Sequence, residues 1–248
     1  MTKPIVECVP NFSEGRNKAI IDRIAAEISS VEEVRLLSVE MGASVNRTVM
    51  TFLGSPDQVK EAAFHAIRKA AELIDMRKQR GLHPRIGATD VCPLVPLRGI
   101  DMEECVALSR ELGKRVGDEL QIPVYLYERS AIRPERRNLA DIRSGNYEEL
   151  EKKLQNPDWM PDYGPTEFNP RTGATIIGAR NMLIAFNINL NTKTVQYAMD
   201  IAFELREKGR SVRTGNTNPI YMRGKLVKYR PNYYPCGNCD FIGKSYED

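Results

Sequence analysis

One loop carries residue types and a spacing that suit acid–base chemistry. It reads Gly81-Leu82-His83-Pro84-Arg85-Ile86-Gly87-Ala88-Thr89-Asp90 and holds one of only two histidines. Pro84 fixes its own backbone and disfavours the helical region for His83, so the imidazole is expected on a stiff, extended segment. Gly87 leaves room for a close approach to the backbone, and Asp90 adds a carboxylate. The loop is therefore a candidate site of proton transfer, and the alternative is a loop histidine with only a structural role.

The other histidine, His65, serves as a comparison. It falls in a segment, 57–76, whose apolar residues recur at helical spacing, and it lies off that apolar stripe. We expect a solvated helix histidine without a chemical role.

Composition limits the class of protein. The chain has 248 residues, 42% of them hydrophobic, and its 36 basic and 33 acidic residues give a net charge of +3. This charge is too small to indicate nucleic-acid binding. No apolar run approaches the ~18 residues that span a bilayer, so no membrane association is expected. The N-terminus has no apolar signal region, which predicts a cytoplasmic protein. Three cysteines lie in apolar segments and are expected as buried free thiols: Cys8, Cys92 and Cys105.

The first half of the chain alternates strand and helix patterns. Apolar runs predict strands, the spacing of four isoleucines predicts a helix, and Ser55-Pro56 is typical of a helix start. The expected elements are a strand at 5–9, a helix at 17–30, strands at 34–39 and 48–53, a helix from Ser55 onward and a strand at 91–95. This order predicts a ferredoxin-like βαββαβ unit, an antiparallel sheet with both helices on one face.

The rest of the chain predicts one further helix and strand, and then a second unit. Asp101-Met102-Glu103-Glu104 forms a capping box, and a strand is expected at 123–127. Residues 128–170 are rich in proline and are expected to cross between units or to line a cleft. Strands at 174–177 and 182–190 and a helix ending near Gly209 start a second, incomplete ferredoxin-like unit. The fold class is therefore α+β, an α/β sandwich with subdomains 1–172 and 173–248.

The tail from Arg210 onward is basic, rich in glycine, proline and tyrosine, and has no periodicity. Its one Cys-x-x-Cys, Cys236-Gly237-Asn238-Cys239, has no second pair or nearby histidine, so no metal site is predicted. Tyrosines between basic residues could stack on single-stranded nucleic acid. A solvated loop is the preferred interpretation, and no nucleic-acid partner is predicted.

Several motifs, in a fixed order from the N-terminus to about Gly209, carry a family resemblance. They are Val6-Glu7-Cys8-Val9-Pro10-Asn11-Phe12-Ser13-Glu14-Gly15, Asn46-Arg47-Thr48-Val49, His83-Pro84-Arg85-Ile86-Gly87-Ala88 with Asp90-Val91-Cys92-Pro93, Pro123-Val124-Tyr125-Leu126-Tyr127, and Gly173-Ala174-Thr175 through Gly178-Ala179-Arg180 to Leu190. The chain resembles the glutamate formimidoyltransferase family, the formiminotransferase domain also found in formiminotransferase-cyclodeaminase.

The resemblance implies a folate-dependent transferase of histidine breakdown. Such an enzyme moves a formimino group from N-formimino-L-glutamate to N5 of tetrahydrofolate, its co-substrate, and uses no metal. The implied fold has two ferredoxin-like units with folate in a tunnel between them, usually in a homodimer, with a cyclodeaminase as a possible partner.

The resemblance also assigns residues. His83 is the catalytic histidine, and Glu40 stands where many relatives carry an aspartate. The folate loop is Gly164, Pro165, Thr166, Glu167, Phe168, Asn169, Pro170, Arg171, Thr172 and Gly173, of which Thr166, Glu167, Asn169, Arg171 and Thr172 fall at variable places.

The chemistry fits these residue types. One imidazole can take a proton from the attacking folate nitrogen and return it to the departing glutamate nitrogen. Because the formamidinium is a cation, Glu40 and Asp90 are candidates to hold it or to orient His83. Both substrates carry carboxylates, and the candidates to receive them are Arg47, Arg85 and Arg180. The alternative for each arginine is an ordinary surface ion pair.

One departure leaves a second function open. Relatives complete the second unit with further strands and a helix that are not found before Asp248. The expectation is that the sequence is a fragment, that the remainder is a separate chain, or that this version is shortened. The competing hypothesis is therefore a folate-binding module without turnover.

Overall fold

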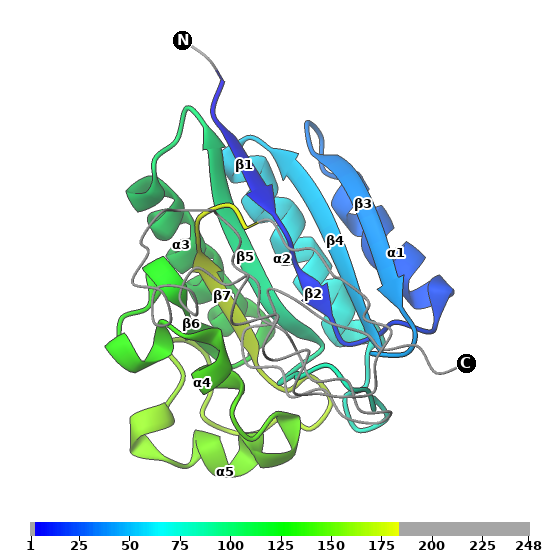
Figure 1. Cartoon of the computed structure of the whole chain (residues 1–248), viewed down its shortest axis with the longest axis vertical. Helices are drawn as coiled ribbons and strands as arrows, with labels where there is room; N and C mark the ends of the chain where they lie inside the picture. The colour runs from blue at the N-terminus through cyan, green and yellow to red at the C-terminus, as the bar shows by residue number, and fades with distance from the viewer. Residues whose placement is uncertain (1–2, 184–248) are drawn as a thin grey trace, which may run out of the picture. The chain divides into compact units, whose positions relative to one another are not determined.

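The fold is built on one mixed sheet of seven strands (Figure 1). The structure, a computed structural model, describes residues 3–183, and the chain divides into compact units at Met182/Leu183. Only the first unit is described here. Its strands are β1 (Ile5–Cys8), β2 (Asn11–Phe12), β3 (Arg35–Gly42), β4 (Arg47–Gly54), β5 (Thr89–Arg98), β6 (Val124–Leu126) and β7 (Thr175–Ala179).

The sheet has an antiparallel half and a parallel half. β1 and β2 each pair with β4 on one side and with β5 on the other, and β3 forms the edge beside β4; all these pairs are antiparallel. Beyond β5, the strands β7 and β6 continue the sheet in parallel pairs. The order across the sheet is therefore β3, β4, β1 with β2, β5, β7 and β6.

Three long helices cover one face of this sheet (Figure 1). Asn17 caps α1 by accepting the backbone N–H groups of Ala19 and Ile20, and the capping box predicted at Asp101 and Glu104 is present at α3. Ser55 is the N-cap residue of α2, as expected, in an extended conformation and followed by Pro56, although its side chain makes no cap hydrogen bond. The helices are α1 (Lys18–Ser29), α2 (Pro56–Leu73) and α3 (Met102–Leu120).

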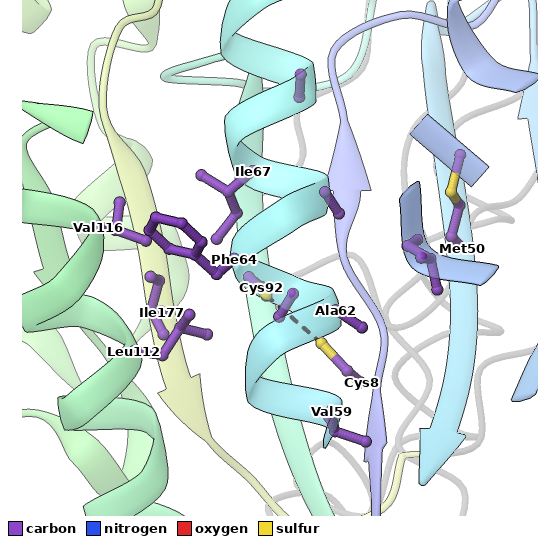
Figure 2. Close-up of a cluster of buried hydrophobic side chains, with 14 of the residues drawn as sticks. Cys8, Met50, Val59, Ala62, Phe64, Ile67, Cys92, Leu112, Val116 and Ile177 are labelled. Atoms are coloured by element: carbon purple, nitrogen blue, oxygen red, sulfur yellow. Dashed lines mark hydrogen bonds between the residues drawn. The ribbon is translucent and has the colours of Figure 1, made fainter. Parts of the chain in front are cut away.

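The buried apolar residues form two clusters, one on each face of the sheet. Ile177 belongs to the cluster under the three long helices, and its neighbour Ile176 belongs to the other cluster. Successive residues of a strand point to opposite faces, so β7 is covered on both sides. Figure 2 shows Phe64 of α2 beside Leu112 and Val116 of α3 in the larger cluster. The expected free thiols are confirmed as buried: Cys8, Cys92 and Cys105.

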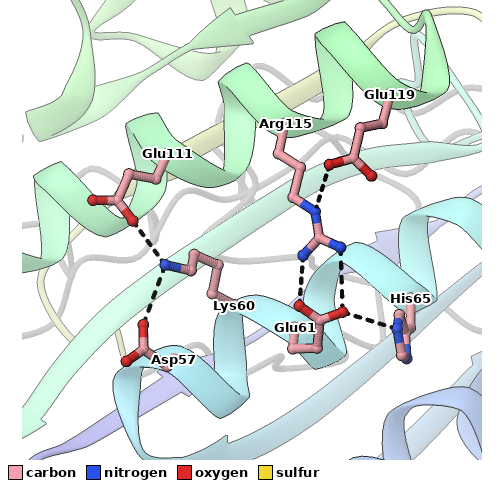
Figure 3. Close-up of polar contacts among 7 residues, drawn as sticks. All are labelled: Asp57, Lys60, Glu61, His65, Glu111, Arg115 and Glu119. Carbon is pink, nitrogen blue, oxygen red and sulfur yellow. Dashed lines mark hydrogen bonds and ion pairs between the residues drawn. The ribbon is translucent and has the colours of Figure 1, made fainter.

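A seam of charges joins α2 to α3 outside this core (Figure 3). Lys60 donates to Glu111 at 2.7 Å, and Arg115 pairs with Glu61 at 2.5 Å. His65 lies in the same seam, half-buried, with its Nε2 3.0 Å from Glu61. His65 is therefore a half-buried partner of Glu61 in this seam rather than the solvated side chain that its position off the apolar stripe predicts.

The segment between β6 and β7 packs on the second face of the sheet. It forms two short helices, α4 (Leu139–Arg143) and α5 (Leu150–Leu154), whose apolar residues join the smaller cluster. Arg136, with 0% exposure, anchors this segment by donating to the carbonyl of Met160 at 2.6 Å and pairing with Asp162 at 2.8 Å. The segment thus covers the sheet of its own unit.

The observed order agrees with the sequence pattern except for the short strand β2, which lies between β1 and α1 and was not expected. The ferredoxin-like assignment stays a prediction. β7 differs from the expectation, because it lies between β5 and β6 in the first sheet rather than opening a second unit. Its run Thr-Ile-Ile-Gly-Ala is buried throughout, as a parallel strand covered on both faces requires. The compact unit accordingly extends past the expected boundary at 172/173. Most of the strand expected at 182–190, the helix expected to end near Gly209 and the Cys-x-x-Cys tail lie outside the described residues.

Candidate active site

His83 lies buried at the amino end of β5, where three separate segments meet. Its exposed fraction is 6%, and its backbone N–H donates to the carbonyl of Val45, in the turn between β3 and β4, at 3.4 Å. From the first residue of β4, Arg47 brings its Nη1 to 2.8 Å from His83 Nε2. Ring and guanidinium therefore form one polar unit across two loops that are distant in the sequence.

This contact fixes the state of the imidazole. A guanidinium can only donate hydrogen bonds, so His83 Nε2 must carry its lone pair and the ring proton must be on Nδ1. Burial lowers the pKa of His83 well below 6.5, and the positive charges of Arg47, Arg143 and Arg85 lower it further, against a smaller opposing effect of a hydrogen bond to the Pro84 backbone. His83 is therefore a neutral base at physiological pH.

Arg85 is held by a carboxylate that the sequence pattern did not indicate. Its guanidinium donates to both oxygens of Glu148, at 2.8 and 3.3 Å, and to the carbonyl of Gln79 at 3.0 Å. Burial of Glu148 would raise its pKa, but the hydrogen bonds and charge of Arg85 lower it overall. The guanidinium predicted to receive a substrate carboxylate is thus already bound bidentately.

Asp90 has a similar partner. It is buried, accepts the Ile86 N–H at 3.0 Å through Oδ1, and pairs through Oδ2 with Arg143 of α4. Asp90 therefore holds the loop that follows His83, and Arg143 adds a positive charge beside the ring. Arg143 is 53 positions from Asp90 in the sequence, and Glu148 is 63 positions from Arg85. Sequence patterns give no pairing signal at such separations.

The glycines of the histidine loop and the predicted folate loop face each other. Gly87 and Gly173 form a bridge between their backbones, and the Ala88 N–H donates to the Thr172 carbonyl at 2.8 Å. A Cβ on Gly87 would come within 2.0 Å of the Ala174 carbonyl oxygen. The close approach expected at Gly87 is therefore confirmed, and the group that approaches is the backbone of this chain at residues 172–174.

The rest of the predicted folate loop is mostly exposed. Gly164 and Gly173 both have positive φ and pack against the backbone of Ile122 and Ile86, so they serve the turn geometry. Phe168 lies 5.7 Å from the Tyr147 ring, between ring centres. Pro165 is half-buried, Thr172 and Gly173 are buried, and the exposed positions are Gly164, Thr166, Glu167, Asn169, Pro170 and Arg171.

Two further predicted residues, Glu40 and Arg180, lie on β3 and directly after β7. Glu40 is exposed on β3, opposite Val49. Arg180 follows β7 and donates to the Asn181 carbonyl at 3.0 Å. Seven residues separate it from Gly173, about 23 Å of extended strand at ~3.3 Å per residue. Arg180 is therefore at the opposite end of the parallel strands from the histidine loop.

A buried polar network supports the loops around His83, and the sequence reasoning missed it. Glu14, buried after β2, accepts the N–H groups of Arg16 and Asn17 at 2.7 and 2.9 Å. Gln79 donates to Glu14 at 3.1 Å and accepts from Asn46 at 2.7 Å. One local signal could have indicated the role of Glu14. This residue lies just before the start of a helix, where a carboxylate can accept hydrogen bonds from free backbone N–H groups.

Among residues 3–183, no three His, Cys, Asp or Glu side chains gather as metal ligands, and no helix is long and apolar enough to cross a membrane. A hollow of about 520 Å³ lies elsewhere, between α3 and the turn after β6. Its lining is Glu103, Val106, Ala107, Arg110, Glu128, Arg129 and Arg137, and includes none of the predicted site residues.

Comparison with known proteins follows this geometry. Residues 5–180 match the formiminotransferase domain, N-terminal subdomain. Over 206 residues the chain is 53% identical to formimidoyltransferase-cyclodeaminase of Mus musculus, covering 83% of this chain and 38% of that protein. It is 49% identical to glutamate formimidoyltransferase of Streptococcus pyogenes, covering 83% and 69%, and 51% identical to that of Thermoplasma acidophilum, covering 82% and 68%.

The chain spans 38% of the length of the first of these relatives. The matched region nevertheless takes in the described segments around His83, from Glu14 to Gly173. The chain belongs to the formiminotransferase domain family, through the N-terminal subdomain of that domain.

Proposed function

We propose that this chain supplies the catalytic histidine of a glutamate formimidoyltransferase. The reaction is transfer of the formimino group from N-formimino-L-glutamate to N5 of tetrahydrofolate, with release of L-glutamate. The observation that carries the proposal is the state of His83, a buried neutral imidazole with its lone pair at Nε2 and a low pKa. Relatives named for this activity, at 49% and 51% identity, support it.

The proton path needs only one group. As N5 of the folate attacks the amidine carbon, it becomes cationic and gives its proton to His83 Nε2. The tetrahedral adduct then breaks at the bond to the glutamate nitrogen, which takes the same proton as it leaves. Protons balance over the cycle, and general acid–base catalysis of this kind contributes typically ~10²–10⁴ in rate.

The charges around the ring suit this cycle. The guanidinium groups of Arg47, Arg85 and Arg143 oppose protonation of His83, so the imidazolium is a short-lived state that returns its proton readily. We propose Arg47 as the receiver of a substrate carboxylate, because its guanidinium lies against the catalytic ring, 2.8 Å from His83 Nε2. Glu40 is the candidate to hold the formamidinium cation.

The folate loop stays part of the proposal. Positions 166–171, which are exposed apart from the half-buried Phe168, would contact the folate. Gly173 and Thr172 join that loop to the histidine loop through backbone hydrogen bonds. Arg180, at the far end of β7, suits a carboxylate of a ligand as long as folate. The proposal also includes a homodimer, a cyclodeaminase partner, and a place in histidine breakdown in the cytoplasm.

A coupled assay of the 248-residue chain tests the proposal. Release of L-glutamate from N-formimino-L-glutamate with tetrahydrofolate is expected, and His83→Ala should lose it while keeping folate binding. His65→Gln is the matched control, because His65 belongs to the seam between α2 and α3. Full activity of His83→Ala would remove His83 from the mechanism. Binding of reduced folate without transfer by the unmodified chain would support the alternative of a folate-binding module.

A further inference from the structure

The ion pair between Arg85 and Glu148 is buried on one side only. The side chain of Arg85 is 8% exposed, whereas that of Glu148 is 53% exposed. If the pair breaks, Glu148 returns to water at little cost, but the arginine charge stays buried without a partner, which is strongly unfavourable. Exchange of Glu148 for another carboxylate avoids this cost, because the guanidinium is paired before and after the exchange.

Buried polar atoms without hydrogen-bond partners lie beside this pair. In the described part of the chain, those at the junction of the histidine loop with residues 143–148 are Arg85 Nε, Thr89 Oγ1, Arg143 Nε and Asn146 Oδ1. Contacts bring these residues together: Arg143 pairs with Asp90, which follows Thr89, and the Asn146 N–H donates to the Arg143 carbonyl at 2.8 Å. Folded proteins rarely leave buried polar groups unpaired, so several at one junction indicate a place for a polar ligand or for water.

The types of these atoms suit an amino-acid carboxylate. The two guanidinium N–H groups and the hydroxyl can donate to carboxylate oxygens, and the amide oxygen of Asn146 can accept an N–H group. A metal cation is disfavoured there, because the charges of Arg85 and Arg143 would repel it. The preferred ligand is therefore an anion that also carries an N–H group.

Glu148 lies on a turn with unusual backbone geometry. Gly145 and Asn146, just before this turn, have φ of 83° and 52°. Positive φ suits glycine, but at Asn146 it stores strain that surrounding contacts must hold in place. The bond from Glu148 to Arg85 is one of those contacts, so release of Glu148 would let the turn relax.

The same turn contacts the predicted folate loop. Tyr147 donates its hydroxyl to the Pro170 carbonyl, and its ring centre lies 5.7 Å from that of Phe168. Glu148, the next residue, binds Arg85, which is two residues after His83. The turn therefore connects the histidine loop with the predicted folate loop.

We propose that Arg85 is a carboxylate subsite with Glu148 as its internal occupant, which a carboxylate of a glutamyl ligand replaces. Thr89, Arg143 and Asn146 complete the subsite through their unpartnered atoms. The identity of the ligand rests on the proposed function, since N-formimino-L-glutamate and folate both contain a glutamyl group. Such a group carries two carboxylates, so this subsite and the one proposed at Arg47 can both be used.

Calorimetric titration of the full chain with L-glutamate tests the exchange. Glu148→Gln removes the internal carboxylate, so L-glutamate should bind about tenfold more tightly than it binds the unmodified chain, or better. Glu149→Gln is the matched control, because it makes the same change of charge at the next residue, which is also exposed and does not bind Arg85. The control should change the affinity by less than about twofold, since a distant exposed charge contributes little.

Arg85→Gln tests the guanidinium itself and should weaken binding of L-glutamate about tenfold or more, because the charge-assisted bonds are lost. If that variant does not fold, Glu148→Gln compared with Glu149→Gln decides alone. Equal affinities in these two variants would overturn the subsite.

A second ligand distinguishes the two possible sources of the glutamyl group. p-Aminobenzoyl-L-glutamate carries the glutamyl end of folate, whereas L-glutamate stands for the amino-acid substrate. The ligand whose affinity rises in Glu148→Gln identifies the source. If neither affinity rises, the exchange is refuted.

These titrations need no turnover, so the subsite and the proposed function can fail separately. In an active chain, Glu148→Gln should lower KM for the substrate whose glutamyl group enters and leave kcat nearly unchanged, because the internal carboxylate competes only with binding. Tighter binding in a chain without transferase activity would refute the proposed function alone. Transferase activity with affinities that are indifferent to Glu148 would refute the subsite alone.

Discussion

Removing the charge of Asp90 should destabilise the unit more than any surface ion pair can. Asp90 and Arg143 have side-chain exposed fractions of 2% and 5%, and Asp90→Asn leaves the arginine charge buried without its partner. Breaking a buried pair from one side costs about 3–5 kcal/mol. Asparagine keeps a side-chain oxygen that can accept the Ile86 N–H, which lies 3.0 Å from Asp90 Oδ1 in the unmodified protein. The decrease in the free energy of unfolding therefore measures the effect of the lost charge. At about 2–4 °C per kcal/mol for a unit of this size, a loss of 3 kcal/mol lowers Tm by about 6–12 °C.

Urea unfolding followed by circular dichroism measures this loss as a change in midpoint at constant slope. Asp22→Asn is the matched control, because Asp22 and Lys18 form an exposed pair on α1 whose loss should cost less than about 1 kcal/mol. The double variant Asp90→Asn with Arg143→Met removes both charges and should recover about 2 kcal/mol. An Asp90→Asn cost no larger than that of Asp22→Asn would refute the reasoning.

Three further outcomes follow from the described contacts. Gly87→Ala should destabilise the unit by about 1–3 kcal/mol, because the added Cβ would clash with the Ala174 carbonyl oxygen. Gly113→Ala is the control and should cost less, because its Cβ would meet only side-chain atoms, at 3.3–3.4 Å. The urea midpoints of the two variants measure the difference. Phe64→Ala should cost about 3–5 kcal/mol, since its ring is buried between α2 and α3, and equal stability of the variant would contradict this packing. Because the pKa of His83 is lowered in the folded state, its contribution to stability is present above about pH 6.5 and is lost as pH falls below that value. Unfolding free energies from pH 8 to 5 should fall less steeply in His83→Gln, and parallel curves would count against the buried neutral ring.

The order of helices and strands up to β5, apart from the two-residue strand β2, could be predicted because their apolar residues repeat at clear periods. The rigid His83 loop was also visible, since Pro84 and its neighbours restrict the backbone locally. β7 was placed in the wrong unit because a short apolar run predicts a buried strand without saying which sheet contains it. Similarly, glycines at 87 and 173 indicated close approach, but not that the two loops approach each other.

The partners of the charged residues could not be predicted, for a different reason. Glu148 and Arg143 reach Arg85 and Asp90 from a segment of short helices with weak periodicity. Their pairing depends on how that segment packs on the second face of the sheet, which no local pattern encodes. The site roles of Glu40, of Arg180 and of the folate loop stay predictions.

The histidine loop has hydrogen bonds on both flanks to segments far apart in the chain, Val45 on one side and Thr172 on the other. Such long-range closures come late, because the entropy of bringing distant segments together is lost before their contacts form. A chain emerging from the ribosome can form β1 to β5 while this loop still has only one neighbour. We therefore expect the imidazole to reach its final geometry in the last stage of folding, and amide exchange at Ala88 to be protected later than exchange in β4.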